Sequence, residues 1–162
     1  MTNTNREATA WHEAGHAVMA MMLGRPIEKV SILPAQLATG NRLGVCKIQK
    51  GRAKGTKDAL EDSVLILLAG MVAESKFTGR YCQHGAAQDL LLVKELLTAN
   101  RAKNEKQFQK LASRMIDKTE HLLEAEGAAR AIQLIADELL EKDTVSGRAV
   151  RHFCQLADAK CR

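Results

Sequence analysis

A short motif near the start of the chain carries the residue types of a metal site. His12, Glu13 and His16 form the pattern HExxH, with the histidines four positions apart. In an α-helix this spacing places both imidazoles on one face, one turn apart, so that they can bind a single Zn²⁺. Glu13 lies about 100° around the helix from His12 and about 60° from His16, so it can reach a water at the metal without being a ligand. The motif predicts metal-assisted hydrolysis with Glu13 as the catalytic base.

The same pattern also arises by chance on surface helices, so its context matters. Gly15 costs about 1 kcal/mol inside a helix, which predicts that another segment packs closely against it. The motif also lies between helix signals. Thr4 and Glu7 have the spacing of a capping box, and Gly24 followed by Pro26 predicts the end of the helix.

A catalytic zinc requires a third protein ligand and an open fourth position. No HxxGxxH extension follows the motif, and no Glu is placed as in thermolysin-like enzymes. Asp89 is the best candidate on sequence, although a carboxylate in the first turn of a helix also suits the helix dipole. Spacing alone leaves Asp89, Glu74 and His84 open as the third ligand.

The elements that must position these residues are expected to be mainly helices. Ala, Leu, Glu, Lys and Gln are plentiful, and the chain has only 2 prolines. A small β-hairpin or sheet is expected after the first helix. After the motif helix, strands are expected at 27–33 and 43–48, joined by a loose loop at 34–42. Helices are then expected at 58–77 and 86–100. Three further helices follow, with a break at Gly127 between the first two and the last helix beginning near Ser146.

Length and composition predict one folded unit. The chain has 162 residues, of which 46% are hydrophobic and 27% charged, as in a globular domain. No repeat, low-complexity tract or linker is evident, so residues 1–162 are expected to form a single domain. Within it, residues 1–100 are the metal-site part and residues 101–162 the C-terminal helical part.

The apolar stretches are too short for a bilayer. The most continuous one, residues 64–73, has about half the length of a transmembrane helix, and the polar start does not resemble a signal peptide. A soluble, cytoplasmic protein with no membrane association is expected. None of the four cysteines forms a CxxC pair, so reduced thiols are expected as well.

The remaining polar residues have simpler interpretations. His84 is interpreted as a solvated loop histidine rather than an oxyanion donor, and His121 and His152 as surface residues. A second zinc site at Cys46, Cys82 and His84 matches no known ligand spacing.

A basic stretch is the best argument for another class of function. It consists of Lys47, Lys50, Arg52, Lys54 and Lys57, in a chain of net charge +5. Aromatic residues make up only 3%, and no nucleic-acid motif is present, which argues against a nucleic-acid-binding protein. A solvated loop is the preferred interpretation.

The whole chain resembles the peptidase domain of the FtsH-type ATP-dependent zinc metalloproteases. The segments that carry the resemblance are HEAGHAV at 12–18, Leu43-Gly44, Leu68-Ala69-Gly70 with Ala73-Glu74, Phe77 and Gly79, Gly85-Ala86 with Asp89-Leu90, and 139–144 with Gly147. The first and fourth of these are the specific ones. The resemblance implies a largely helical fold with a small β element, His12, His16 and Asp89 as zinc ligands, and Glu13 as base. Glu74 matches a carboxylate near the site, which leads to the hypothesis that it orients a histidine.

The resemblance also implies partners that the sequence does not contain. Family members carry membrane segments and an AAA ATPase ahead of the peptidase domain, whereas no Walker A loop occurs here. The chain is therefore expected to cleave unfolded proteins or peptides, alone or with an AAA ATPase acting in trans, and to form a homo-oligomer. Substrate docking by strand addition along residues 44–48 is a further hypothesis. The alternative is a non-catalytic, metal-containing module that oligomerises or docks an ATPase.

Overall fold

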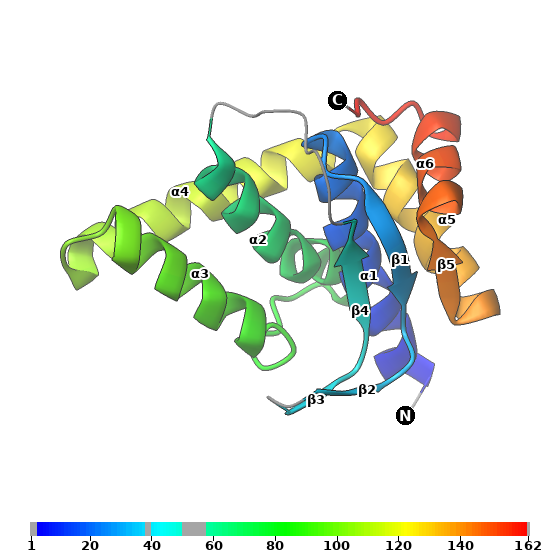
Figure 1. The fold of residues 1–162 in the computed structure, drawn as a ribbon, viewed down its shortest axis with the longest axis horizontal. Helices are drawn as coiled ribbons and strands as arrows, with labels where there is room; N and C mark the ends of the chain where they lie inside the picture. The colour runs from blue at the N-terminus through cyan, green and yellow to red at the C-terminus, as the bar shows by residue number, and fades with distance from the viewer. Residues whose placement is uncertain (1–2, 38–39, 50–57, 162) are drawn as a thin grey trace.

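The computed structural model describes residues 3–37, 40–49 and 58–161 of the chain. Most of these residues are helical, and the strands are short, as the sequence predicts (Figure 1). The basic stretch at 50–57 lies outside the described residues. In chain order the elements are α1 (Asn3–Met22), β1 (Ile27–Ser31), β2 (Ala35–Leu37), β3 (Gly40–Arg42), β4 (Val45–Ile48), α2 (Ala59–Thr78), α3 (Ala87–Asn100), α4 (Glu105–Glu124), α5 (Glu126–Lys142), β5 (Thr144–Ser146) and α6 (Gly147–Leu156).

The centre of the molecule is the contact between α1 and α2. The buried face of α1 consists largely of small residues, which lets the backbone of α2 approach closely. A Cβ atom at Gly15 would lie 2.5 Å from the carbonyl oxygen of Ala69 and 2.5 Å from Cβ of Ala73. The expectation that a segment packs closely against Gly15 is therefore confirmed, and that segment is α2.

A three-stranded antiparallel sheet lies beside α1, in the order β4-β1-β5. The predicted pairing of the two strands after the first helix is confirmed, with shorter bounds. The loose loop predicted at 34–42 is wrong, because β2 and β3 pair there as a second, two-stranded sheet. The third strand, β5, was also not predicted. Its three residues pair with β1 across more than a hundred positions, and no local pattern marks such a short partner.

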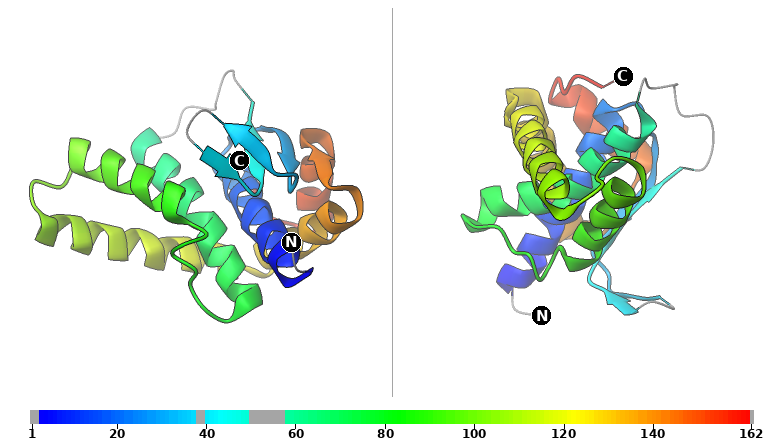
Figure 2. Two further views of the ribbon diagram at one scale, coloured as in Figure 1. Left: turned by 90° about the horizontal axis from the view of Figure 1, so that it is seen from below. Right: turned by 90° about the vertical axis from the view of Figure 1, so that its left-hand side faces the viewer.

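Two hydrophobic clusters lie on opposite sides of α2. The larger contains buried residues of α1, α2, α5, α6 and β1. The smaller joins the outer face of α2 to α3 and α4, with Leu68, Val93 and Leu97 at its centre. Figure 2 shows α3 and α4 extending together as an arm away from the body that contains α1 and the sheet.

The helix ends follow local chemistry, with two differences from the sequence prediction. Gly79 ends α2 in the left-handed conformation (φ 78°), as expected. Ser146 caps α6 by accepting a hydrogen bond from the N–H of Ala149. Thr4, however, lies inside α1, which already begins at Asn3. The break between α4 and α5 falls at Ala125 rather than at Gly127, because the extended Ala125 backbone (φ −55°, ψ 133°) ends the first helix.

The N-terminal helix is also tied to the C-terminal half. Arg6 donates hydrogen bonds to the carbonyl oxygen of Leu140 (2.8 Å) and pairs with the carboxylate of Asp143 (2.6 Å). After β5 the chain passes so close to β1 that a Cβ at Gly147 would lie 1.7 Å from the carbonyl oxygen of Ile27. A glycine is therefore required at the start of α6.

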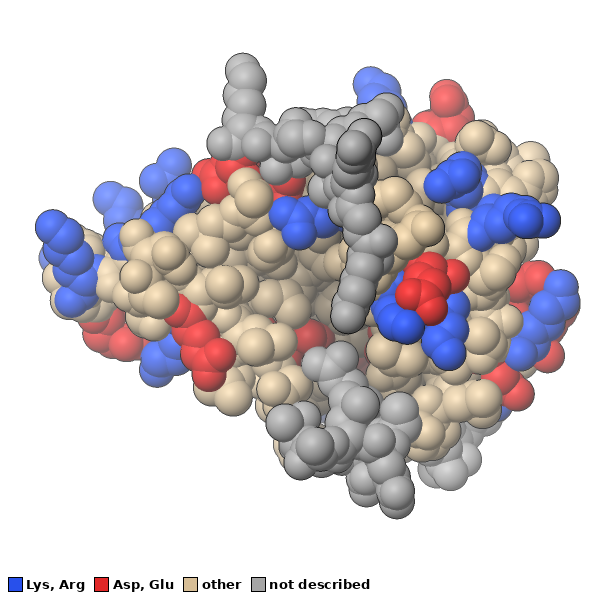
Figure 3. Space-filling view, in the orientation of Figure 1, with Lys and Arg blue, Asp and Glu red and all other residues tan. Residues whose placement is uncertain are grey.

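Charged side chains of both signs lie on the described surface (Figure 3). None of the described helices combines the length and hydrophobicity that a bilayer span requires. On the face in Figure 3, Lys and Arg are interleaved with Asp and Glu rather than gathered into one patch. That distribution gives no support to nucleic-acid binding by this face.

Candidate active site

The motif helix presents three polar side chains toward the interior. His12 is 8% exposed, Glu13 7% and His16 8%, although α1 is otherwise buried among apolar residues. The imidazole rings of the two histidines lie 4.7 Å apart, nearly perpendicular to each other. The i, i+4 spacing thus brings both rings to the same place, on the side of α1 that faces α2.

Asp89 completes a cluster of three potential metal donors. It lies in the first turn of α3, and its Oδ2 is 3.1 Å from Nε2 of His12 and 3.3 Å from Nε2 of His16. Donors around a tetrahedral zinc lie about 3.3 Å apart when each is about 2 Å from the ion, so these separations fit zinc. Among the described residues, His12, His16 and Asp89 form the group of His, Cys, Asp or Glu side chains whose ligand atoms all lie within 4.8 Å of one another.

The other imidazole nitrogens are held by groups on α2. Nδ1 of His12 donates to Oε2 of Glu74 (3.0 Å), and Nδ1 of His16 donates to the carbonyl oxygen of Ile66 (2.7 Å). Because these hydrogen bonds anchor both Nδ1 atoms on α2, both Nε2 atoms are directed toward Asp89. This is the arrangement by which supporting groups orient metal-binding histidines, and it is the contact that the Glu74 hypothesis anticipates.

A glycine on α2 leaves the room that the histidines occupy. A Cβ at Gly70 would lie 2.5 Å from Nε2 of His16 and 2.6 Å from Nε2 of His12. Any side chain at this position would therefore fill the space where the donors meet. In the sequence, Gly70 is marked only by its place in the family resemblance. A glycine within an otherwise apolar helix was the available signal of a close approach.

Glu13 is enclosed by Gly44, the residue directly before β4. A Cβ at Gly44 would lie 2.8 Å from both Cγ and Oε1 of Glu13, and 2.9 Å from the carbonyl oxygen of Ser31. The absence of a side chain at Gly44 thus gives the carboxylate its place between α1 and the sheet. Strand β4 therefore begins directly beside the Glu13 carboxylate, the group that would act as a general base.

The charges of the site strongly perturb two ionisable groups. Burial lowers the pKa of His12, but its hydrogen bonds with Asp89 and Glu74 and the charge of Glu13 outweigh burial and raise the pKa to about 10. Burial raises the pKa of Asp89, but its contacts with His12 and His16 hold that pKa well below its usual range. Without a metal, the cluster therefore keeps a proton on His12 at neutral pH. A bound cation has to displace that proton.

The other candidate residues do not join the cluster. His84 is exposed in the turn before α3, and His121 and His152 are exposed on α4 and α6, which agrees with their interpretation as surface residues. Cys46, Cys82 and His84 form no group of metal donors among the described residues. All four cysteines are free thiols, as expected.

A buried helix that presents two histidines and a glutamate of an HExxH motif, completed by a carboxylate from another helix, is the architecture of a zinc-dependent peptidase. The model of peptidase family M41 matches residues 1–101, a segment that contains the entire cluster. The chain belongs to this family.

Three relatives illustrate the match, and each is an ATP-dependent zinc metalloprotease FtsH. The protein of Rhodothermus marinus is 41% identical over 88 residues, covering 52% of this chain and 12% of its own length. That of Protochlamydia amoebophila is 36% identical over 87 residues, covering 52% of this chain and 9% of its own. That of Syntrophobacter fumaroxidans is 28% identical over 196 aligned positions, covering 96% of this chain and 30% of its own. The chain thus spans less than a third of each of these relatives.

The raised pKa of His12 predicts how the metal-free protein responds to pH. A histidine whose folded pKa (about 10) exceeds its unfolded value (6.5) stabilises the fold fully below pH 6.5, and this contribution is lost as pH rises through about 10. Urea unfolding in the presence of a chelator measures this loss. The free energy of unfolding of the wild type should exceed that of His12→Gln, and the difference should shrink from pH 6.5 to about 10. An NMR titration of His12 with a midpoint near 6.5 would contradict the prediction, and Glu74→Gln should lower the midpoint.

Proposed function

We propose that this chain is a zinc metalloendopeptidase that hydrolyses peptide bonds in unfolded proteins or peptides. Its zinc ligands are His12, His16 and Asp89. The observation that carries the proposal is the convergence of the three donor atoms, together with the two Nδ1 hydrogen bonds that aim both imidazoles at the same point. Membership of family M41 and the zinc metalloproteases among its relatives support the choice of metal.

The catalytic work is divided between the metal and Glu13. Zinc, when bound, supplies a Lewis acid that polarises the scissile carbonyl and lowers the pKa of a coordinated water toward about 7. Glu13 accepts the proton of the attacking water and then donates it to the leaving amine. Its enclosure by Gly44 limits the positions of the carboxylate, which favours one productive orientation over a mobile, solvated one.

The substrate is proposed to bind along β4. This strand is at the edge of its sheet, since β1 is its partner on one side and β5 pairs with the other side of β1. An extended peptide that adds to this edge forms backbone hydrogen bonds without any side-chain requirement, which suits unfolded segments of varied sequence. Gly44, directly before β4, would bring such a peptide next to Glu13.

The partner protein, the assembly and the location are proposed from the properties of the relatives. Because the relatives are ATP-dependent, we propose that an AAA ATPase, acting in trans, unfolds and delivers the substrate. We further propose a homo-oligomeric assembly in the cytoplasm, in which residues 1–162 act as one domain. The metal cluster draws its residues from α1 and α3 and its supporting groups from α2, so all of them lie in the first 100 residues.

Replacing Glu13 with Gln separates metal binding from catalysis. The variant is expected to keep its zinc and to lose casein hydrolysis by at least about 10²-fold, because Gln cannot accept the proton. Zinc content by atomic emission and casein cleavage at equal zinc loading measure the two properties. Glu7→Gln, on the same helix, is the matched control and should remain active. Cleavage by Glu13→Gln at the wild-type rate would remove Glu13 as the base. If neither protein cleaves casein, the non-catalytic module or the need for an ATPase is favoured.

Replacing Asp89 with Ala tests the third ligand. Glu74→Gln keeps all three donors and loses only a supporting hydrogen bond, so its zinc affinity should fall by about 10- to 100-fold. Asp89→Ala loses a donor, so its zinc affinity should fall by more than that. Competition with a chromophoric chelator measures the affinities. Gln88→Ala, at an exposed neighbouring position, is the control. Full zinc occupancy of Asp89→Ala at limiting metal would exclude Asp89 from the ligand set.

Peptides with a modified backbone test binding to β4. A peptide that is N-methylated at alternate residues in the register that faces β4 should lose at least about tenfold in kcat/KM, because each missing N–H removes a strand-to-strand hydrogen bond. The same peptide methylated in the opposite register is the matched control and should be cleaved normally. Equal cleavage of both peptides would argue against strand addition.

A further inference from the structure

Two thiols lie near each other at the C-terminal end of α6. Cys154 is buried on α6, whereas Cys161 is exposed on the segment that follows α6. Both line one open cavity of about 400 Å³, together with Arg151, Asp158 and Met21 of α1. The two thiols lie near enough to each other that each is the first cause of the other's shifted pKa.

A tight backbone turn brings the second thiol back to the first. The N–H of Ala157 donates to the carbonyl oxygen of Phe153 (2.9 Å), and the N–H of Ala159 donates to that of Cys154 (2.9 Å). Between them, Asp158 adopts a positive φ of 57°, which reverses the chain. The proximity of the two thiols is therefore set by the fold of residues 154–161.

The turn is also pressed against the start of α5. A Cβ at Gly127 would lie 2.4 Å from the carbonyl oxygen of Asp158 and 2.9 Å from the nitrogen of Ala159. Because Gly127 has no side chain, the backbone of the turn can pack directly on the surface of α5. This packing limits how far Cys161 can move away from Cys154.

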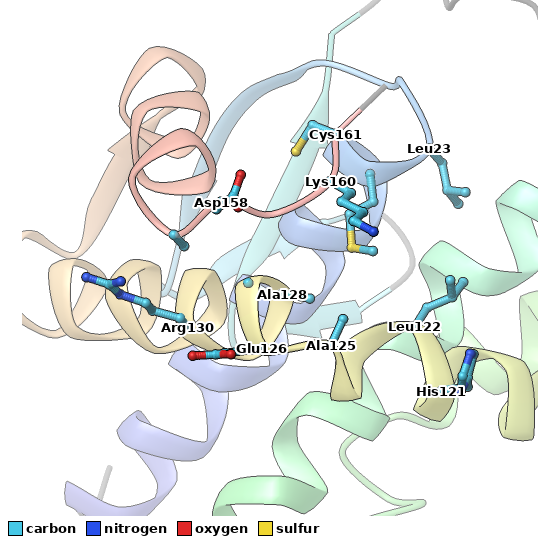
Figure 4. Close-up of a pocket in the computed structure, with 13 residues that line it drawn as sticks. Leu23, His121, Leu122, Ala125, Glu126, Ala128, Arg130, Asp158, Lys160 and Cys161 are labelled. Carbon is cyan, nitrogen blue, oxygen red and sulfur yellow. The ribbon is translucent and has the colours of Figure 1, made fainter.

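Small molecules can reach Cys161 through a second cavity. This cavity has a volume of about 820 Å³ and lies between the end of α1, the junction of α4 and α5, and the C-terminal segment. Figure 4 shows Cys161 and Lys160 on one side of it, with Leu122 and Ala125 on the opposite side. A reactive thiol at the wall of an open cavity next to a buried partner thiol is the arrangement of a redox-active pair.

We propose that Cys154 and Cys161 form a reversible intramolecular disulfide, with hydrogen peroxide as the oxidant, that fixes the C-terminal segment to α6. The Cys161 thiolate attacks one peroxide oxygen, the O–O bond breaks, and the departing hydroxide takes up a proton to give water and a Cys161 sulfenic acid. The Cys154 sulfur then attacks the Cys161 sulfur. Hydroxide leaves and takes the thiol proton of Cys154 as a second water, so that two thiols are oxidised as one peroxide is reduced.

The charges of the pair support this order of events. The hydrogen bond from Cys154 lowers the pKa of Cys161, so the exposed thiol is the one that ionises first. The same hydrogen bond, followed by burial, raises the pKa of Cys154. Oxidation converts the Cys161 thiolate into a neutral sulfenic acid, which removes a negative charge that raises the pKa of Cys154, so Cys154 becomes easier to ionise for the second step. Cys46, by contrast, is held as a thiol by burial and by the charges of Glu13 and Asp89, which raise its pKa.

The test uses a protein with Cys46→Ser and Cys82→Ser, so that only this pair remains. After treatment with one equivalent of hydrogen peroxide and quenching with catalase, alkylation should find no free thiol, and the mass should fall by about 2 Da. Dithiothreitol should restore both thiols. The disulfide should form at least about tenfold faster in the folded protein than in urea, because the fold holds the thiols together.

Two further measurements keep the result independent of these substitutions. Peptide mapping of the oxidised wild-type chain should give the Cys154–Cys161 linkage, and in Cys154→Ser dimedone should trap the sulfenic acid at Cys161. Alkylation of both thiols after peroxide treatment would overturn the proposal. So would a linkage between two chains, or equal rates in the folded protein and in urea.

Discussion

The close packing of α1 against α2 is the constraint on which the site depends. At Gly15 the backbone of α2 packs directly against α1, and at Gly70 on α2 the missing side chain leaves room for the imidazoles of His12 and His16. This approach brings Glu74 and the carbonyl oxygen of Ile66 within hydrogen-bonding distance of the histidines. A wider separation would leave two buried Nδ1 groups without acceptors, which costs more than an ordinary lost contact. The small residues along this interface therefore serve the geometry of the metal donors as much as the core.

The site concentrates negative charge in a buried place. Three carboxylates, those of Glu13, Glu74 and Asp89, act on His12, and all three lie in largely buried surroundings. Such a concentration is costly without a counter-charge, which in the absence of metal is the proton on His12. A divalent cation at the common point of the donors neutralises the cluster more fully than a proton does. The buried negative charge and the types of the donor residues therefore both favour a divalent metal ion at this site.

Much of the site could be predicted from the sequence, because its key spacing lies within one helix. The positions of His12, Glu13 and His16 follow from helical periodicity alone. Asp89 could be chosen over Glu74 and His84 only through the family resemblance, since no local pattern states how α3 is placed against α1. Gly44 and Gly70 could not be assigned roles, because their importance lies in the backbones that approach them. Strand β5 could not be predicted for the same reason. It is a strand because it pairs with the open edge of β1, and the local sequence does not show that edge.

The position of β1 in the sheet also has a consequence for how the protein acquires its structure. One partner, β4, follows β1 closely in the chain, whereas the other, β5, lies more than a hundred residues downstream. During synthesis, the β1–β4 ribbon is complete long before residues 144–146 emerge, and one edge of β1 stays open in the meantime. Closure of such a long loop is slow compared with helix formation. The nascent chain therefore passes through a stage in which its helices can form while a strand edge awaits its last partner, and this is the stage at which pairing with another chain competes with folding.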